Sequence, residues 1–214
     1  MSANACAVIS KRELGMCRFG PVKPRVDIAP TTGPFTGIDL AAPTLVMADA
    51  ENLVFGARDL GRKINFAALA NLLQDAFPRV DLHACYSAPA VGGHMCCDLV
   101  GTGWTVHRRL IIESAFIKGS GANADVSLAF HSAALIGKFR PQNFVLASGD
   151  GMLVLDIGRA IKAQFPDCRV VVTASLAGST SRLIDARVEH VITQNIEIGL
   201  DVMLPLYRGA QRRT

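Results

Sequence analysis

The sequence predicts an α/β fold with a mostly parallel central sheet and helices on both of its faces. Short apolar runs of strand length alternate along the chain with longer segments of helical periodicity. This alternation is typical of βαβ units, in which crossover helices leave the strands parallel and buried. The chain has 214 residues, of which 50% are hydrophobic, so it is long enough to bury a core as one domain.

The first 42 residues are predicted to form an extended or flexible arm, because prolines and glycines recur there without a periodic apolar pattern. We assign a domain to residues 43–207 and a basic tail to residues 208–214. The formal charge is +4 in residues 1–26, +3 in the tail and −3 in the rest of the chain. Contact with nucleic acid should therefore depend on the tails, on local patches or on metal ions. Basic tails can equally serve solubility.

In the first half of the domain, the clearest helix is expected after Asn65, a good N-cap residue. Apolar residues then recur at helical spacing through residues 66–77, and Pro78 ends the helix. The strands are shorter runs with apolar or alternating character. Three of them are predicted here, at residues 44–48, 80–86 and 105–112.

In the second half, a helix is predicted over residues 124–136, with Gly137 at its end. The most distinct strand is Asn143–Ala147, which precedes a turn and a helix over residues 153–165 that Pro166 stops. The remaining expected elements are a strand at 169–174, a short helix at 180–186 and a final strand at 190–193.

The sequence argues against membrane-spanning and secreted proteins. No apolar run reaches eighteen residues, so no membrane span is expected. The apolar patch Ala5–Ile9 precedes Lys11 and Arg12, which is the wrong order for a secretory signal. Six cysteines in a chain that can form a core without disulfides are interpreted as reduced thiols. We therefore expect a cytoplasmic protein.

Three of the cysteines lie near histidines, which raises the alternative of a zinc site. Cys85, Cys96 and Cys97 are close in sequence to His83 and His94. Their spacings do not match the paired frames of common zinc sites. His83 and Cys85 fall on one face of a predicted strand, where small buried residues are expected. Buried thiols are therefore the default interpretation, with zinc as the alternative.

Three aspartates are the main candidates for chemistry. Asp49 follows the first predicted strand of the domain, Asp150 follows the strand Asn143–Ala147, and Asp125 opens the preceding helix. In open α/β sheets, ligands bind beyond the carboxyl ends of the strands. Three carboxylates gathered there repel one another unless a proton or a cation intervenes, and Mg²⁺ or Mn²⁺ is the expected cation. Each aspartate can alternatively act only as a turn or helix cap.

Other site patterns are weaker. The chain lacks a Gly-x-x-x-x-Gly-Lys phosphate loop, a Gly-x-Gly-x-x-Gly turn after the first strand and a Gly-x-Ser-x-Gly elbow. Trp104, His107, Arg108 and Arg109 are candidates for a patch that stacks on bases and binds phosphate. The alternative is a strand with an exposed basic edge.

Several short motifs follow one another over most of residues 44–195. They are Asp49-x-x-Asn52-Leu53, Ile64-Asn65-Phe66, Lys118 ahead of Ala124-Asp125-Val126, Ser148-Gly149-Asp150-Gly151 and the closing stretch 179–192. No single motif is decisive, but in this order they resemble the NYN domains of the PIN-like nuclease superfamily.

The resemblance implies a Rossmann-like three-layer sandwich and metal-dependent cleavage of RNA by an activated water. Asp49, Asp125 and Asp150 would be both the catalytic residues and the ligands of Mg²⁺ or Mn²⁺. Substrate contacts would come from Asn52, Lys118 and Ser148. RNA is then the expected partner, and Ala-rich helices with moderate charge also permit a homodimer.

Two positions depart from the family pattern. Active relatives carry aspartate where this chain has His131 and Met152, and the stretch Ser120–Ala124 is an addition before Asp125. A neutral imidazole binds Mg²⁺ poorly and a thioether does not bind it. The sequence therefore leaves open a second function, a catalytically weakened module that binds RNA or protein.

Overall fold

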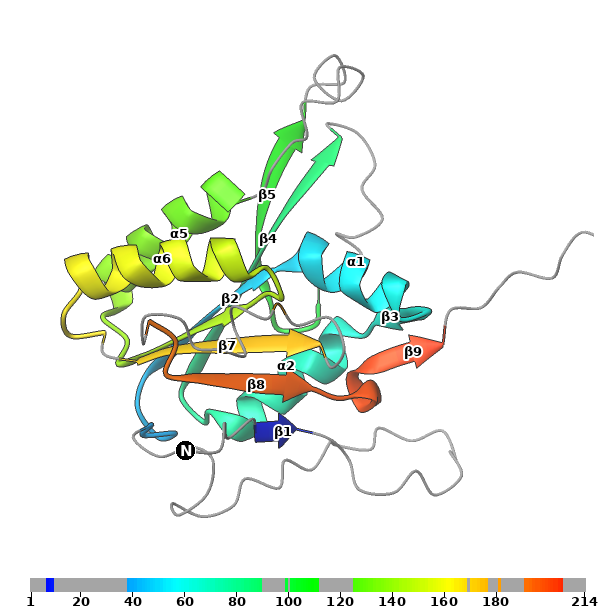
Figure 1. The fold of residues 1–214 in the computed structure, drawn as a ribbon, viewed down its shortest axis with the longest axis horizontal. Helices are drawn as coiled ribbons and strands as arrows, with labels where there is room; N and C mark the ends of the chain where they lie inside the picture. The colour runs from blue at the N-terminus through cyan, green and yellow to red at the C-terminus, as the bar shows by residue number, and fades with distance from the viewer. Residues whose placement is uncertain are drawn as a thin grey trace, which may run out of the picture.

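The protein is an α/β sandwich built on a parallel seven-stranded sheet (Figure 1). The computed structural model describes residues 7–9, 38–89, 99, 101–111, 125–168, 170–176, 181 and 191–205. The strand order is β1-β8-β7-β6-β2-β4-β5, and every neighbouring pair is parallel. The strands are β1 Ala7–Ile9, β2 Thr44–Asp49, β4 Val80–Pro89, β5 Thr105–Ile111, β6 Asn143–Ala147, β7 Val170–Leu176 and β8 Gln194–Ile198.

The order of the strands reverses beside β2. Counted along the chain from β2, the six longer strands lie in the order 3-2-1-4-5-6, the arrangement of a doubly wound sheet. The chain leaves β2 toward β4 and β5 on one side, then returns through a helix to β6 on the other side. The carboxyl ends of β2 and β6 therefore form the crevice in which ligands bind in folds of this kind.

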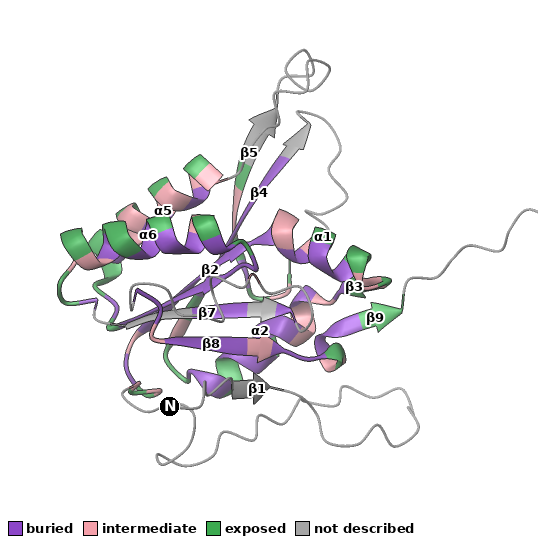
Figure 2. Ribbon diagram, in the orientation of Figure 1, coloured by how far each residue is buried: buried purple, intermediate pink, exposed green. Residues whose placement is uncertain are grey.

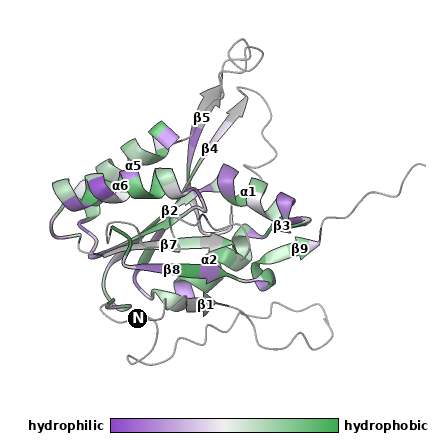
Figure 3. Ribbon diagram, viewed as in Figure 1, coloured by the Kyte–Doolittle hydropathy of each residue, from purple (hydrophilic) through white to green (hydrophobic). Residues whose placement is uncertain are grey.

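Helices cover both faces of the sheet. They are α1 Ala50–Asp59, α2 Phe66–Ala76, α5 Asp125–Phe139 and α6 Gly151–Gln164. Along β2, Val46 and Ala48 pack into a core with α1 and α2, whereas Leu45 and Met47 pack into a core with α5 and α6. The sheet is buried between these two cores (Figure 2), and hydrophobic residues gather where strands and helices meet (Figure 3). The expected Rossmann-like three-layer sandwich is thus confirmed.

A small second sheet closes one end of the α1–α2 face. β3 (Arg62–Ile64) pairs antiparallel with β9 (Met203–Pro205), after the 3-10 helix η2 (Leu200–Val202). Ile64, Val202 and Met203 are buried in the same core as α2. This sheet anchors the end of the described chain to the loop between α1 and α2.

Most predicted elements are confirmed, and several boundaries are corrected. α5 continues through Gly137 to Phe139, because the left-handed conformation of Arg140 (φ 47°) and then Pro141 end it instead. α6 begins at Gly151 rather than at residue 153, because Asp150 caps it.

The last strand is shifted, and four elements were not predicted. Val191 and Ile192 are buried without belonging to a strand, and β8 follows them as Gln194–Ile198. Its polar start is hidden from a hydrophobicity pattern, because Asn195 is buried while accepting a hydrogen bond from Thr173 Oγ1 at 2.6 Å. α1, β1, β3 and β9 were not expected, and β1 lies within the predicted arm. The helix predicted at 180–186 falls outside the described residues except for Ser181.

Candidate active site

Two of the predicted aspartates lie at the crevice where the strand order reverses. Asp49 is the last residue of β2, and Asp150 follows the carboxyl end of β6. β2 and β6 are hydrogen-bonded neighbours, with Ala48 beside Ala147 in the register. The fold therefore brings together two carboxylates that are about a hundred residues apart in the sequence.

Each of these aspartates also caps a helix. Asp49 Oδ1 accepts a hydrogen bond from the backbone N–H of Asn52 at 3.1 Å, at the start of α1. Asp150 Oδ1 accepts from the backbone N–H groups of Met152 at 3.0 Å and Leu153 at 3.3 Å, at the start of α6. The capping role is thus real, and in both residues it uses only the Oδ1 atom. Two helix N-termini, which favour negative charge, point at the same crevice.

A short hydrogen-bond network joins the turn after β6 to the start of α1. Ser148 is fully buried, and its hydroxyl donates to Asp49 Oδ2 at 3.4 Å while accepting from the backbone N–H of Asp150 at 3.2 Å. Asn52 Oδ1 accepts from the backbone N–H of Gly149 at 2.7 Å. Ser148 and Asn52 therefore set the spacing between the two aspartates. The buried hydroxyl of Ser148 is an internal link between the turn after β6 and Asp49.

The charges of Asp125 and Asp150 act on the buried carboxylate of Asp49. The pKa of Asp49 is raised from 3.8 to about 6, chiefly by burial and also by the negative charges of Asp125 and Asp150. The hydrogen bonds from Asn52 and Ser148 oppose this effect. A carboxylate that is 5% exposed and has two acidic neighbours is stabilised by any cation that enters the crevice.

Asp125 and Asp150 form the outer part of the site. Asp125 is the first residue of α5 and is half-buried, whereas Asp150 is exposed. Their side chains can reach solvent, whereas Asp49 is buried at the end of β2. The site thus combines one buried carboxylate with two that a hydrated ligand can approach.

The oxygen atoms of the aspartates are ligands of the kind that a hard divalent cation prefers. Among the described residues, no three His, Cys, Asp or Glu side chains are gathered closely enough to hold an ion directly. Mg²⁺ is often held by one or two carboxylates, with waters and substrate phosphates completing its octahedron. Asp49 and Asp150 are hard oxygen donors of the right kind for such a water-rich site. The residues present therefore fit Mg²⁺ or Mn²⁺ in chemistry, with water in place of a third direct protein ligand.

Two further residues lie near this crevice, namely Glu51, which was not singled out from the sequence, and Cys85, which was interpreted there as a buried thiol. Glu51 Oε1 accepts a hydrogen bond from the backbone N–H of Ser87 at 3.0 Å, which ties the first turn of α1 to β4. Cys85 lies beside Asp49 in the register, and burial together with the Asp49 charge raises the pKa of its thiol to about 12. Glu51 could have been selected from the sequence, because it is an acidic residue two positions after Asp49. The position of Cys85 next to Asp49 could not, because it depends on the register of β4 against β2.

The two departures from the family pattern have different surroundings. Met152 is 58% exposed on the first turn of α6. His131 is half-buried on α5, where its ring stacks on the ring of His107 with centroids 4.2 Å apart. The His131 ring is therefore engaged with a strand at the edge of the sheet. Lys118, the predicted phosphate contact, lies outside the described residues.

The structure bears on two alternatives that the sequence left open, the base-stacking patch and the zinc site. The predicted base-stacking patch does not include Trp104, which is buried and donates from Nε1 to the backbone oxygen of Phe66 at 2.9 Å. Trp104 therefore belongs to the hydrophobic core directly before β5, and not to a surface that binds bases. For the zinc alternative, His83 Nδ1 lies 2.9 Å from His107 Nε2, and Cys85 is a buried free thiol. His94, Cys96 and Cys97 fall outside the described residues.

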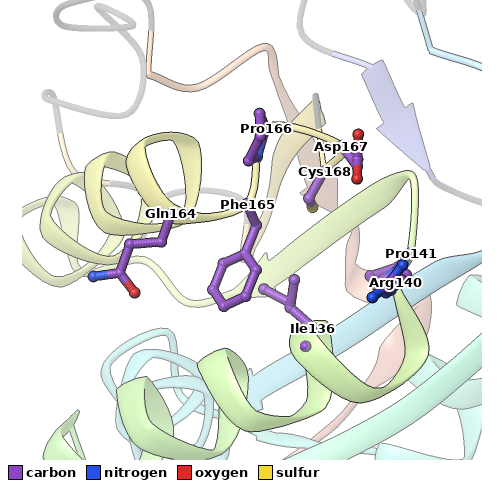
Figure 4. A pocket seen from close by; sticks show the side chains of 9 residues that line it. Ile136, Arg140, Pro141, Gln164, Phe165, Pro166, Asp167 and Cys168 are labelled. Atoms are coloured by element: carbon purple, nitrogen blue, oxygen red, sulfur yellow. The ribbon is translucent and has the colours of Figure 1, made fainter.

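The structure also has a pocket of about 310 Å³ at the opposite edge of the sheet (Figure 4). It lies where α5 and α6 end, with Ile136 and Phe165 among its apolar side chains and Arg140 and Asp167 among its charged ones. This is the amino edge of the parallel strands, where doubly wound folds do not place their ligands. The aspartate crevice is therefore the better candidate site.

Comparisons with known proteins support the fold and do not identify a function. No family model matches the chain, and no curated protein matches it. The chain is similar to the crystal structure of a protein of unknown function from Vibrio parahaemolyticus, with a TM-score of 0.60 and 18% identity. The match covers 78% of this chain and 99% of that one. Within the described residues, no helix is both long and apolar enough to cross a bilayer.

Proposed function

We propose that this protein is a divalent-metal-dependent ribonuclease of the NYN and PIN-like type. The observation that carries this proposal is the raised pKa of Asp49, about 6, caused by its burial and by the charges of Asp125 and Asp150. Repulsion between neighbouring carboxylates destabilises a fold unless a proton or a cation intervenes. Such an arrangement is typical of sites that a cation completes. The position of the aspartates at the reversal of strand order supports the same conclusion.

In this proposal, Asp49 and Asp150 hold Mg²⁺ or Mn²⁺, and Asp125 orients the attacking water. The ion supplies a water of lowered pKa and neutralises charge on the phosphodiester. Asp125 is suited to accept a proton from that water, because it is half-buried and stands at the mouth of the crevice.

The remaining residues position these groups. Ser148 holds Asp49 Oδ2 and the Asp150 backbone, while Asn52 holds the Gly149 backbone. The N-termini of α1 and α6 both face the crevice and favour a bound phosphate. Lys118 and the basic ends of the chain would collect RNA through its backbone charge, so binding should weaken with added salt.

The test is cleavage of a labelled RNA with Mn²⁺ or Mg²⁺ by the full chain. The variant Asp49→Asn with Asp150→Asn keeps the size and capping capacity of both side chains. We expect cleavage to disappear in this variant and to require the metal in the wild type. Cleavage that persists unchanged in the double variant would remove the assignment.

The second candidate function is an RNA-binding or protein-interaction module with a weakened metal site. Met152 favours it, because this exposed thioether stands where active relatives carry an aspartate. Calorimetry with Mn²⁺ separates the two functions. Tight Mn²⁺ binding that is lost in the double variant supports the nuclease, whereas RNA binding without Mn²⁺ binding supports the module.

We also propose a cytoplasmic location and self-association. Cys85 and Cys168 are buried free thiols, which suits a reducing compartment.

On α5, Val126 and Phe130 are 72% and 71% exposed, which supports a homodimer through this helix. Sedimentation at several concentrations tests the dimer, and a monomer at all of them would contradict it.

A further inference from the structure

Three histidines from three different elements form a continuous stack at one edge of the sheet. His83 on β4 and His107 on β5 have centroids 5.2 Å apart with planes inclined by 19°. His107 and His131 on α5 have centroids 4.2 Å apart with planes inclined by 28°. We call His83, His107 and His131 the histidine stack. It lies on the face of the sheet that α5 covers, where His107 shares a register row with Cys85 and Asp49.

The hydrogen bond inside the stack depends on protonation. His83 Nδ1 lies 2.9 Å from His107 Nε2, so one of these nitrogens must donate and the other must accept. A fully protonated imidazole has two N–H donors and no acceptor. The contact is therefore lost if both rings are protonated, and charges on rings this close also repel one another.

The environment favours the neutral forms of His83 and His107 near pH 7. The pKa of His107 is lowered to about 4, chiefly by burial and also by the neighbouring His131 and His83. Burial also lowers the pKa of His83 below its ordinary value of 6.5. Of the charged neighbours, Asp81 on β4 favours protonation of His83, and Lys138 on α5 opposes it. Arg108, next to His107 on β5, projects from the other face of the sheet by strand alternation.

The stack joins α5 to the two outer strands, β4 and β5. α5 also packs through the buried residues Leu128 and Ile136, which belong to a core shared with β2, β6 and Cys85 of β4. Toward β4 and β5, the described ring contacts are the stack itself and Phe139, whose ring lies 6.2 Å from that of His83. Asp125 is the first residue of the same helix, so the position of α5 controls its approach to Asp49.

We propose that the histidine stack is an acid-sensitive clamp, which holds α5 on β4 and β5 near neutral pH and releases it when protonated. Release withdraws Asp125 from Asp49 and so dismantles the aspartate site. The clamp is independent of the proposed nuclease function, because it concerns only the position of α5.

The test is amide hydrogen exchange of the full chain at pH 7.5 and pH 5.5, corrected for the intrinsic effect of pH. We expect peptides from α5 to lose protection by about tenfold relative to peptides from α6 on acidification. In the variant His83→Phe with His107→Phe and His131→Phe, ring packing remains but none of the three rings can titrate, so the difference should disappear. Arg159→Gln, on the exposed side of α6, is the control and should behave as the wild type. Equal behaviour of α5 and α6 in the wild type would overturn the clamp.

A second measurement does not depend on the folding of the variants. Proton–carbon NMR of the imidazole rings of the wild-type chain follows each histidine through a pH titration. We expect His83 and His107 to titrate below 6.5 and to show coupled curves. Independent titration of both rings at or above 6.5 would overturn the proposal.

Discussion

The two edges of the sheet, where the parallel strands end and where they begin, expose different side chains to solvent. At the carboxyl edge, α1 and α6 begin, and the caps Asp49 and Asp150 bring negative charge to one crevice. At the amino edge, α5 and α6 end, and the chain forms a hollow lined by residues such as Phe165 and Arg140. The amino edge has the cavity, whereas the carboxyl edge has the acidic side chains.

This difference follows from the direction of the strands. Because all strands of the main sheet are parallel, helix N-termini collect at one edge and helix C-termini at the other. N-termini expose backbone N–H groups that favour carboxylates, phosphates and other anions. A hollow is therefore a weaker indication of function in this fold than a group of polar side chains at the reversal of strand order.

The largest expected effect comes from comparing one aspartate at each edge. Asp150→Asn should lower metal-dependent RNA cleavage by about 100-fold or more, because it removes a charge that holds the ion. Asp167→Asn, at the exposed rim of the amino-edge pocket, should leave cleavage unchanged. Initial rates with Mn²⁺ measure both variants. Equal losses in the two variants would erase the distinction between the edges.

The next effect is on stability. The folded-state pKa of Asp49 is about 6 and its ordinary value is 3.8, so the folded state binds the proton more tightly. The free energy of unfolding therefore falls as pH rises from 3.8 to about 6 and stays low above it. Asp49→Asn should raise the free energy of unfolding by about 2 kcal/mol at pH 7.5. The gain should vanish below pH 3.8, where both states of the wild type are protonated. Urea unfolding at the two pH values measures it, and a loss of stability at pH 7.5 would count against the raised pKa.

At the amino edge, polar side chains should matter for stability alone. Asn143 is buried, and its Nδ2 donates to the backbone oxygen of Asp39 at 2.7 Å and to Thr44 Oγ1 at 3.1 Å. Asn143→Ala should lower the free energy of unfolding by about 1.5 kcal/mol, because it removes two hydrogen bonds made from a buried position. Mn²⁺ binding by calorimetry should not change. A weakened affinity for Mn²⁺ would show that the two edges are coupled.

The smallest effect separates capping from metal binding. Asn65 Oδ1 accepts from the backbone N–H of Ala68 at 3.2 Å and caps α2, away from the aspartates. Asn65→Ala should cost about 1 kcal/mol of stability and leave Mn²⁺ binding intact. Asp150→Ala should show a similar capping cost together with a loss of Mn²⁺ affinity. If the two variants differ in neither property, Asp150 is only a cap.

Much of the fold was predictable because its signals are local. Asn65 with Pro78 bounded α2, and the apolar runs at β2 and β6 identified the central strands. α1 was missed because a residue like Asp49 reads equally as the end of a strand and as a cap. β8 was misplaced because its buried polar residues are satisfied by partners in β7, which no local pattern reveals.

The part of the candidate site that could be predicted from the sequence is the pair of aspartates that follow predicted strands. The rule that ligands bind at carboxyl ends was enough to select Asp49 and Asp150 before their proximity was known. The link from Ser148 to Asp49 joins residues 99 positions apart, so it required the fold. The histidine stack could not be predicted for the same reason. The contact of His83 with His107 depends on the pairing of β4 with β5.

The most direct test of the central claim is the titration of the Asp49 carboxyl group, followed by carbon NMR with and without Mg²⁺. We predict a pKa of about 6 without the ion. Added Mg²⁺ should lower this pKa by about one unit or more, because a cation in the crevice favours the charged form. A pKa at the ordinary value of 3.8, or one that Mg²⁺ does not change, would contradict the account.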